Sequence, residues 1–197
     1  MTTIVVVRKN GYAAVAADTL TKWGSTKESA EFITNHRKIL RVGTSLLAVS
    51  GPSAGHLALG DFFTRRSRRR AGVPRLESVA AIYRLWQELH SALREDYFLR
   101  PNEEDNDAFE SSRISVLIAN AGGIFGVDAL RTVQQYRRFY AYGRGNEYAM
   151  GAMYAVYDRP DFDADAIARY GVEVAAQFDD GTGLPIDSEV VKLRRGV

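Results

Sequence analysis

The chain has 197 residues, of which 46% are apolar and 25% are charged, and its net charge is +2. This composition is that of an ordinary globular protein, and the length predicts one domain over residues 1–197 that buries roughly 70% of its unfolded surface. The sequence contains no cysteine, which excludes disulfides, thiol catalysis and cysteine-bound metal, and the small net charge gives no overall field for nucleic acid.

The start of the chain does not look like a targeting segment. Its apolar run Ile4–Val7 is too short for a signal peptide, and Arg8-Lys9 follow that run instead of preceding it. No stretch approaches 18 consecutive apolar residues, so no membrane span is expected. A cytoplasmic protein is therefore expected.

Two β-like apolar runs, residues 3–8 and 12–17, open the chain, and Asn10-Gly11 between them is the strongest short hairpin signal. Residues 18–38 form a polar excursion with no predicted element. The remaining pattern predicts two strands, two helices, three strands, two helices and a strand, at residues 39–42, 45–50, 56–70, 75–98, 113–119, 124–127, 132–142, 145–157, 163–176 and 188–194. Because strands and helices come in groups, the order indicates a layered α+β fold and not alternating βαβ units.

The segment Gly51-Pro52-Ser53-Ala54-Gly55 matches the G-x-S-x-G pattern of serine hydrolases. That mechanism requires an acid and then a histidine further along the chain, but no histidine follows His90. The pattern also belongs in a parallel α/β sheet, which the order of elements argues against. We therefore favour a glycine-bounded turn that opens a helix.

The run Arg65–Arg70 is basic enough to consider phosphate binding. Cations also complement the dipole at the C-terminal end of a helix, and no aromatic platform accompanies the run. A solvated helix end or a subunit contact is the favoured interpretation. His36 and His56 lack the spacing of metal ligands, so neither a metal nor a cofactor is expected.

Met1 is followed by Thr2, and removal of a start methionine would leave that threonine with both a hydroxyl and a free α-amine. A threonine hydroxyl needs a nearby base, and an α-amine titrates near 7.7–8.0, where a general base works well. The opening hairpin returns Asp18 toward its start, and Lys38 begins the next strand pair. A lysine near the hydroxyl would lower its pKa, and an acid would keep that lysine charged and oriented. By spacing alone, three unrelated surface residues remain the alternative.

The segments TTIVVVRKNG…AAD, RKILRVG and LLAVSGPSAG resemble those of the N-terminal-threonine peptidases, which include proteasome β subunits and bacterial HslV. The order of elements extends this resemblance over nearly the whole chain. Within the family, the sequence is most similar to the proteasome homologue of betaproteobacteria, since a polar insertion before Lys38 separates it from HslV. The resemblance implies a four-layer αββα N-terminal-nucleophile hydrolase fold and a threonine-type endopeptidase.

The resemblance also implies roles for individual residues, carried over motif by motif. It makes Thr2 the nucleophile and base, Asp18 and Lys38 the supporting ion pair, Gly51 the donor of an oxyanion N–H, Asp179 and Thr182 in DDGTG the support of the amine, and Val49 part of a modest apolar specificity pocket. One position departs from the family pattern: Arg144 stands where the family has the serine of Gly-Ser-Gly. Its guanidinium would favour a neutral amine, crowd the site or point into the chamber.

The main expectation is a self-compartmentalising peptidase, in which two stacked rings of identical chains hydrolyse peptides or unfolded proteins. The resemblance implies a 14-mer, with a 12-mer as the alternative. From another class, a weakly active or inactive ring that sequesters substrates is motivated by Arg144 and by the case in which Met1 is retained. A third candidate is a small-molecule amidase on the same fold. The sequence identifies neither a natural substrate nor an unfoldase partner.

Overall fold

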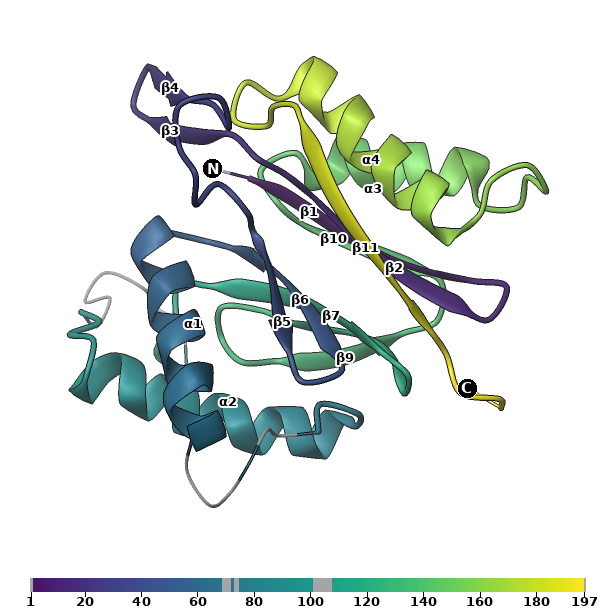
Figure 1. Cartoon of the computed structure of the whole chain (residues 1–197). Helices are drawn as coiled ribbons and strands as arrows, with labels where there is room; N and C mark the ends of the chain where they lie inside the picture. Colours follow the sequence, from purple (N-terminus) through teal and green to yellow (C-terminus); the bar gives the residue numbers. More distant parts are fainter. Residues whose placement is uncertain (1, 69–71, 73–74, 101–107, 197) are drawn as a thin grey trace.

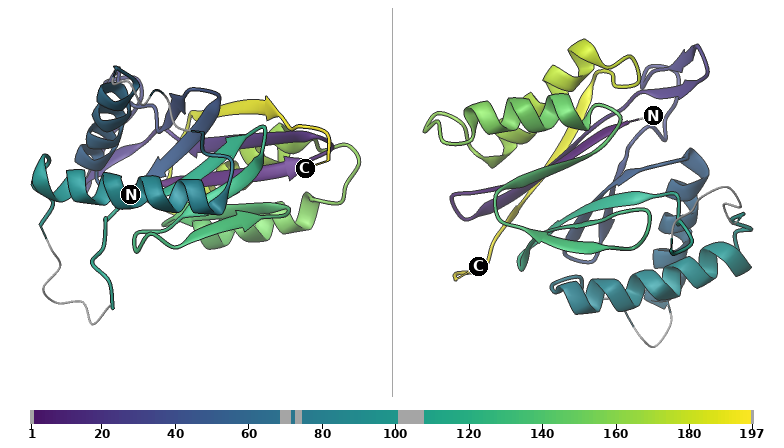
Figure 2. Two further views of the ribbon diagram at one scale, coloured as in Figure 1. Left: turned by 90° about the horizontal axis from the view of Figure 1, so that it is seen from below. Right: turned by 180° about the vertical axis from the view of Figure 1, so that it is seen from behind.

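The computed structural model describes residues 2–68, 72, 75–100 and 108–196, and these form four stacked layers (Figure 1). One helix pair covers the outer face of a four-stranded sheet, a five-stranded sheet packs on its inner face, and a second helix pair covers the far side (Figures 1 and 2). The α+β class and the four-layer order expected from the sequence are confirmed.

All the paired strands run antiparallel, and the two large sheets have the strand orders β10-β1-β2-β11 and β5-β6-β7-β8-β9. The strands are β1 (Thr3–Lys9), β2 (Tyr12–Asp18), β3 (Thr21–Trp23), β4 (Thr26–Glu28), β5 (Ile39–Val42), β6 (Ser45–Ser50), β7 (Ser115–Asn120), β8 (Gly123–Val127), β9 (Val133–Tyr136), β10 (Phe139–Gly143) and β11 (Ile186–Lys192). The helices are α1 (Ser53–Arg68), α2 (Val79–Glu95), α3 (Asn146–Val156) and α4 (Ala164–Phe178). None of the helices in the described part of the chain is long and apolar enough to cross a membrane.

The β1–β2 hairpin forms as the Asn10-Gly11 signal predicts. Both residues have positive φ angles, 50° and 77°, which a tight two-residue hairpin turn of type I′ requires. Successive side chains of β1 alternate between layers: Val5 packs against α3 and α4, whereas Ile4 and Val6 pack against the second sheet. Because both faces are covered, this hairpin is buried along most of its length and holds its N-terminal end in place.

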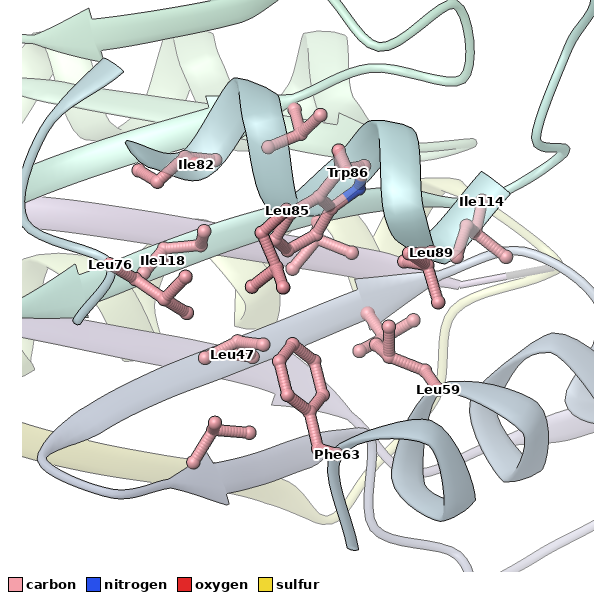
Figure 3. Close-up of a cluster of buried hydrophobic side chains, with 14 of the residues drawn as sticks. Leu47, Leu59, Phe63, Leu76, Ile82, Leu85, Trp86, Leu89, Ile114 and Ile118 are labelled. Carbon is pink, nitrogen blue, oxygen red and sulfur yellow. The ribbon is translucent and has the colours of Figure 1, made fainter. Parts of the chain in front are cut away.

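The second sheet and the helices α1 and α2 enclose a separate apolar cluster. Trp86 of α2 lies at its centre, 6.4 Å from the ring of Phe63 of α1, and Leu47 of β6 faces both helices (Figure 3). Burying a large aromatic or aliphatic side chain stabilises a fold by about 1.5–3 kcal/mol, so this cluster anchors the helix pair on the sheet. The Ser78 hydroxyl accepts from the Ala81 N–H and fixes the start of α2.

Two parts of the predicted element order are wrong. Residues 132–142 are not one strand, because β9 ends the five-stranded sheet and β10 lies at the edge of the four-stranded sheet. The polar excursion 18–38 also contains the short hairpin of β3 and β4, which the Trp23 side chain closes by donating to Glu28. Helix α1 begins at Ser53, before the predicted start at 56, and its predicted end at 70 lies outside the described residues.

Candidate active site

The N-terminal end of β1 lies beside the β3–β4 hairpin, whereas the C-terminus lies at the opposite end of the same sheet (Figures 1 and 2). The register of the sheet brings distant segments to this end, since Thr3 pairs with Gly143 of β10 and Ile186 of β11 pairs with Asp18 of β2. Three connections therefore converge on Thr2: the segment after β2, the β10–α3 turn and the α4–β11 connection.

Asp18 is the centre of the hydrogen-bonding network around Thr2. Its Oδ1 accepts from the Thr2 hydroxyl at 2.8 Å, the Thr3 N–H at 2.9 Å and the Lys38 ammonium at 2.7 Å. Its Oδ2 accepts from two further backbone N–H groups, each at 3.2 Å. The carboxylate has no exposed surface, so this dense set of donors replaces the water that an ionised group would otherwise need.

Lys38 supplies the positive charge of this buried cluster. Its ammonium also donates to the Leu20 carbonyl at 2.7 Å, and burial lowers the pKa of Lys38 from its ordinary value while the charge and hydrogen bond of Asp18 oppose that change. Burial and the charge of Lys38 lower the pKa of the nearby His56 to about 4. At neutral pH the imidazole of His56 is therefore uncharged.

A second chain of hydrogen bonds starts at Thr3. The Gly145 N–H donates to the Thr3 hydroxyl at 3.1 Å, the two hydroxyls of Thr3 and Thr182 lie 2.6 Å apart, and Thr182 donates to Asp179 Oδ2 at 2.6 Å. A backbone N–H can only donate and an ionised carboxylate can only accept, so Thr3 donates to Thr182. Asp179 and Thr182 therefore hold Thr3, the residue that follows Thr2.

Sequence reasoning missed Thr3, although the Thr2-Thr3 pair carried a usable signal. Successive side chains of a strand point to opposite faces, so two adjacent threonines present their hydroxyls on different sides. One hydroxyl meets Asp18, and the other meets Thr182 below the helix layer. A pair of hydroxyls at the first positions of a buried strand therefore predicts two separate hydrogen-bonding networks.

Arg144 joins both networks. Its backbone N–H donates to the Thr2 carbonyl oxygen at 2.9 Å, while its half-exposed guanidinium contacts Asp179 Oδ1 at 3.1 Å and Asp180 Oδ1 at 2.8 Å. Asp180 also pairs with the Lys22 ammonium at 2.5 Å. The ion pairs with Lys22 and Arg144 lower the pKa of the exposed Asp180 carboxyl, the larger effect coming from the hydrogen bond of Lys22. Neither Asp180 nor Lys22 was expected in this cluster.

The two glycines around Arg144 are required by close backbone contacts. Gly143 has a φ of 98°, and a Cβ there would overlap the carbonyl oxygen of Thr2. At Gly145 a Cβ would overlap the hydroxyl of Thr3 and come within 2.9 Å of the Ala175 side chain. The β10–α3 turn can therefore approach the start of β1 only without side chains at both positions.

Gly143→Ala is expected to lower the free energy of unfolding by about 2 kcal/mol or more, since the new methyl group meets backbone in a conformation that costs alanine about 1–3 kcal/mol. Urea unfolding measures this effect. Gly151→Ala is the matched control, because that glycine lies in α3 and a Cβ there meets no atom within 4 Å. Alanine favours a helix interior by up to about 1 kcal/mol, so the control should be slightly stabilised. Equal midpoints for the two variants would contradict this explanation of Gly143.

The remaining site residues predicted from the sequence have different positions. Gly51 is exposed directly after β6, with a φ of 144°, and a Cβ there would lie 2.7 Å from the Arg113 carbonyl oxygen. Val49 has no exposed surface and packs in the cluster under α1 and α2, so its part in a specificity pocket stays a prediction. Met1 lies outside the described residues. The G-x-S-x-G segment is a turn that opens α1 at Ser53, as favoured.

Two arginines of the basic run at the end of α1 pair with carboxylates. Arg65 contacts Asp61 at 2.7 Å, and Arg66 contacts Glu88 of α2, whereas Arg69 and Arg70 lie outside the described residues. Within the described ranges, no group of three or more His, Cys, Asp or Glu side chains is arranged to hold a metal ion.

Comparison with known proteins places this site in a family. No protein-family model matches the chain. The solved structure of Thiobacillus denitrificans BPH has a TM-score of 0.92 and is 51% identical over 98% of this chain and 99% of that one, and its complex with epoxomicin has a TM-score of 0.90. HslV of Bartonella quintana, an ATP-dependent protease subunit, is 27% identical over 201 residues, covering 100% of this chain and 94% of the relative.

Eukaryotic HslV from Trypanosoma brucei shares the fold, with a TM-score of 0.70 at 22% identity over 96% of this chain and 99% of that one. The relation to BPH is far closer and spans nearly the whole of both proteins. The resemblance noted in the sequence is thus confirmed: the chain is a threonine-type peptidase and belongs to the N-terminal-threonine peptidases, with BPH, HslV and the proteasome β subunits.

Proposed function

We propose that this peptidase is a self-compartmentalising enzyme of the cytoplasm, in which Thr2 cleaves peptide bonds inside a double ring of identical chains. The observation that carries the proposal is the Asp18 carboxylate oxygen, which accepts from the Thr2 hydroxyl at 2.8 Å and from the Lys38 ammonium at 2.7 Å. A shared acceptor holds the cation close to the hydroxyl. A positive charge there stabilises the oxygen as it loses its proton.

The proposed reaction begins with removal of Met1, which frees the α-amine of Thr2. The amine takes the hydroxyl proton as the oxygen attacks the carbonyl carbon of the substrate, giving a tetrahedral oxyanion that the Gly51 N–H stabilises. The protonated amine then gives its proton to the leaving amine, and the carbon–nitrogen bond breaks. Water, deprotonated by the same amine, attacks the ester carbon. The bond between that carbon and the Thr2 oxygen then breaks, the amine returns the proton to this oxygen, and the second product leaves with a new carboxyl group.

The other residues of the site keep this geometry fixed in the proposed mechanism. Asp18 orients both the hydroxyl and Lys38, while Asp179 and Thr182 hold the Thr3 hydroxyl and with it the backbone next to the amine. Orientation of this kind contributes to catalysis because reacting groups must be within about 3–3.5 Å and aligned. Val49 is proposed to form part of a modest apolar specificity pocket.

Assembly into rings is supported by the relation to BPH and to the ATP-dependent protease subunit HslV, which spans nearly the whole chain. We propose a 14-mer acting on peptides or unfolded proteins, with the 12-mer as the alternative, and binding of epoxomicin as in Thiobacillus denitrificans BPH.

Two mass measurements test the assembly and the processing together. Native mass spectrometry should give a particle of fourteen chains, and intact-chain mass should correspond to a chain that lacks Met1. Hydrolysis of fluorogenic peptides by that particle completes the test. A particle that retains Met1 and does not turn over peptides would support a sequestering ring instead. A monomer or dimer active only on small amides would support an amidase.

A further inference from the structure

Asp179 is a nearly buried carboxylate, with a side chain only 4% exposed, and both of its oxygens are occupied. Its Oδ2 accepts from the Thr182 hydroxyl at 2.6 Å, and its Oδ1 lies 3.1 Å from the Nε of Arg144. A hydroxyl donor leaves the charge of a buried acid uncompensated, and an uncompensated buried charge is costly. Arg144 brings the opposite charge to Asp179.

The guanidinium of Arg144 reaches two neighbouring carboxylates of unequal exposure. Its Nη1 lies 2.8 Å from Asp180 Oδ1, on a side chain that is 58% exposed, whereas the Asp179 side chain is almost out of water. An exposed ion pair stabilises a protein by about 0–1 kcal/mol, and a pair with a buried partner costs far more to break. The contact with Asp179 is therefore the one that fixes the loop.

Both ends of Arg144 act on the start of β1. Its backbone N–H donates to the Thr2 carbonyl oxygen at 2.9 Å, while its side chain acts through Asp179 and Thr182 on the Thr3 hydroxyl. These contacts link three segments to one another: the β10–α3 turn, the α4–β11 connection and the start of β1. Loss of the guanidinium would leave the buried Asp179 carboxylate without its cation.

We propose that Arg144 is a positioning residue of this peptidase, which holds Thr2 in place through the buried Asp179 carboxylate and the Thr182 and Thr3 hydroxyls. The inference rests on the proposed function, because a positioning role of Arg144 requires that Thr2 is the nucleophile. Arg144 needs no contact with the substrate or with the reacting atoms for this role. At the position where the family has the serine of Gly-Ser-Gly, Arg144 forms an ion pair that connects the β10–α3 turn with the α4–β11 connection.

The planar fork of arginine suits this task better than an ammonium group. It presents the Nε donor to Asp179 in a fixed geometry, whereas lysine carries a compact charge on a flexible stem. Arg144→Lys should therefore keep the charge beside Asp179 and restore only part of the positioning. Arg144→Gln removes the charge and keeps a polar side chain of intermediate length.

The test compares Arg144→Gln and Arg144→Lys with Asp180→Asn, which removes the exposed ion pairs of Asp180 with Arg144 and Lys22 and keeps the contact of Arg144 with Asp179. We expect Arg144→Gln to lower kcat by about tenfold to a hundredfold with KM within about twofold, the loss typical of small misplacements of a reacting group. Arg144→Lys should fall between it and the wild type, and Asp180→Asn should stay within about twofold. Amide hydrogen exchange over residues 2–7 should become faster in Arg144→Gln and remain unchanged in Asp180→Asn.

The outcomes test the positioning role of Arg144 and the proposed function separately. Unchanged kcat and unchanged exchange in Arg144→Gln would overturn the positioning role, and so would a lower kcat with unchanged exchange. If Arg144→Gln does not fold, Arg144→Lys decides, since full wild-type kcat and exchange there would also overturn it. A wild-type particle without turnover would overturn the proposed function, while the exchange comparison would still decide the role of Arg144.

Discussion

Thr2→Ala, in a chain from which Met1 has been removed, is expected to lower kcat on fluorogenic peptides by about a thousandfold or more. The proposed mechanism has one nucleophile, and removing it leaves only binding and oxyanion stabilisation to accelerate the reaction. The fold should survive, because Asp18 keeps the Lys38 ammonium and its backbone donors and loses one hydroxyl. The loss of a hydrogen bond to a charged group costs about 1.5–3 kcal/mol.

Thr2→Ser is the matched variant, because it keeps the hydroxyl and removes only a methyl group. It should retain measurable turnover, and both variants should assemble into the same particle by native mass. Processing is checked by intact-chain mass before any rate is compared, since an α-amine on residue 2 exists only after Met1 is removed. Turnover retained by a trimmed Thr2→Ala chain would end the assignment of Thr2 as the nucleophile.

The fold followed from the sequence wherever one local signal was sufficient. Asn10-Gly11 predicted the β1–β2 hairpin, and an antiparallel hairpin must return Asp18 to the start of β1. The two errors in the predicted strands, at residues 132–142 and at the β3–β4 hairpin, have local causes. Residues 132–142 are rich in the aromatic and β-branched residues that strands favour, so the composition does not reveal that the chain changes sheets between β9 and β10. Strands of three residues, as in β3 and β4, are too short to show any period.

The site was predictable only in part, because its contacts join loops that are far apart in the chain. Thr3 and Thr182 are 179 positions apart, and their contact depends on how the α4–β11 connection meets β1. The resemblance to the family pointed to Asp179 and Thr182, but the contact of these residues with Thr3 needed the structure. Arg144 was noticed as a departure from a motif. Its pairing with Asp179 and Asp180 is a property of the converging loops, which no spacing in the sequence encodes.

Lys38→Ala is expected to remove turnover and to destabilise the fold by about 3–5 kcal/mol, since it leaves the fully buried Asp18 carboxylate without its cation. Urea unfolding and peptide hydrolysis measure the two effects. Arg37→Ala is the adjacent control: Arg37 pairs with Asp187 and Glu189 at the surface, where ion pairs contribute about 0–1 kcal/mol. This control should unfold close to the wild-type midpoint.

The combination of Asp18→Asn with Lys38→Met separates the stability of the ion pair from its part in catalysis. Removing both charges leaves no isolated buried ion, so the double variant should be less destabilised than the sum of the single variants. Turnover should nevertheless stay lost, because no cation then lies near the Thr2 hydroxyl and no carboxylate orients it. Recovery of activity together with stability would mean that the pair only holds the fold. Recovery of stability alone would assign the charges of Asp18 and Lys38 to the reaction.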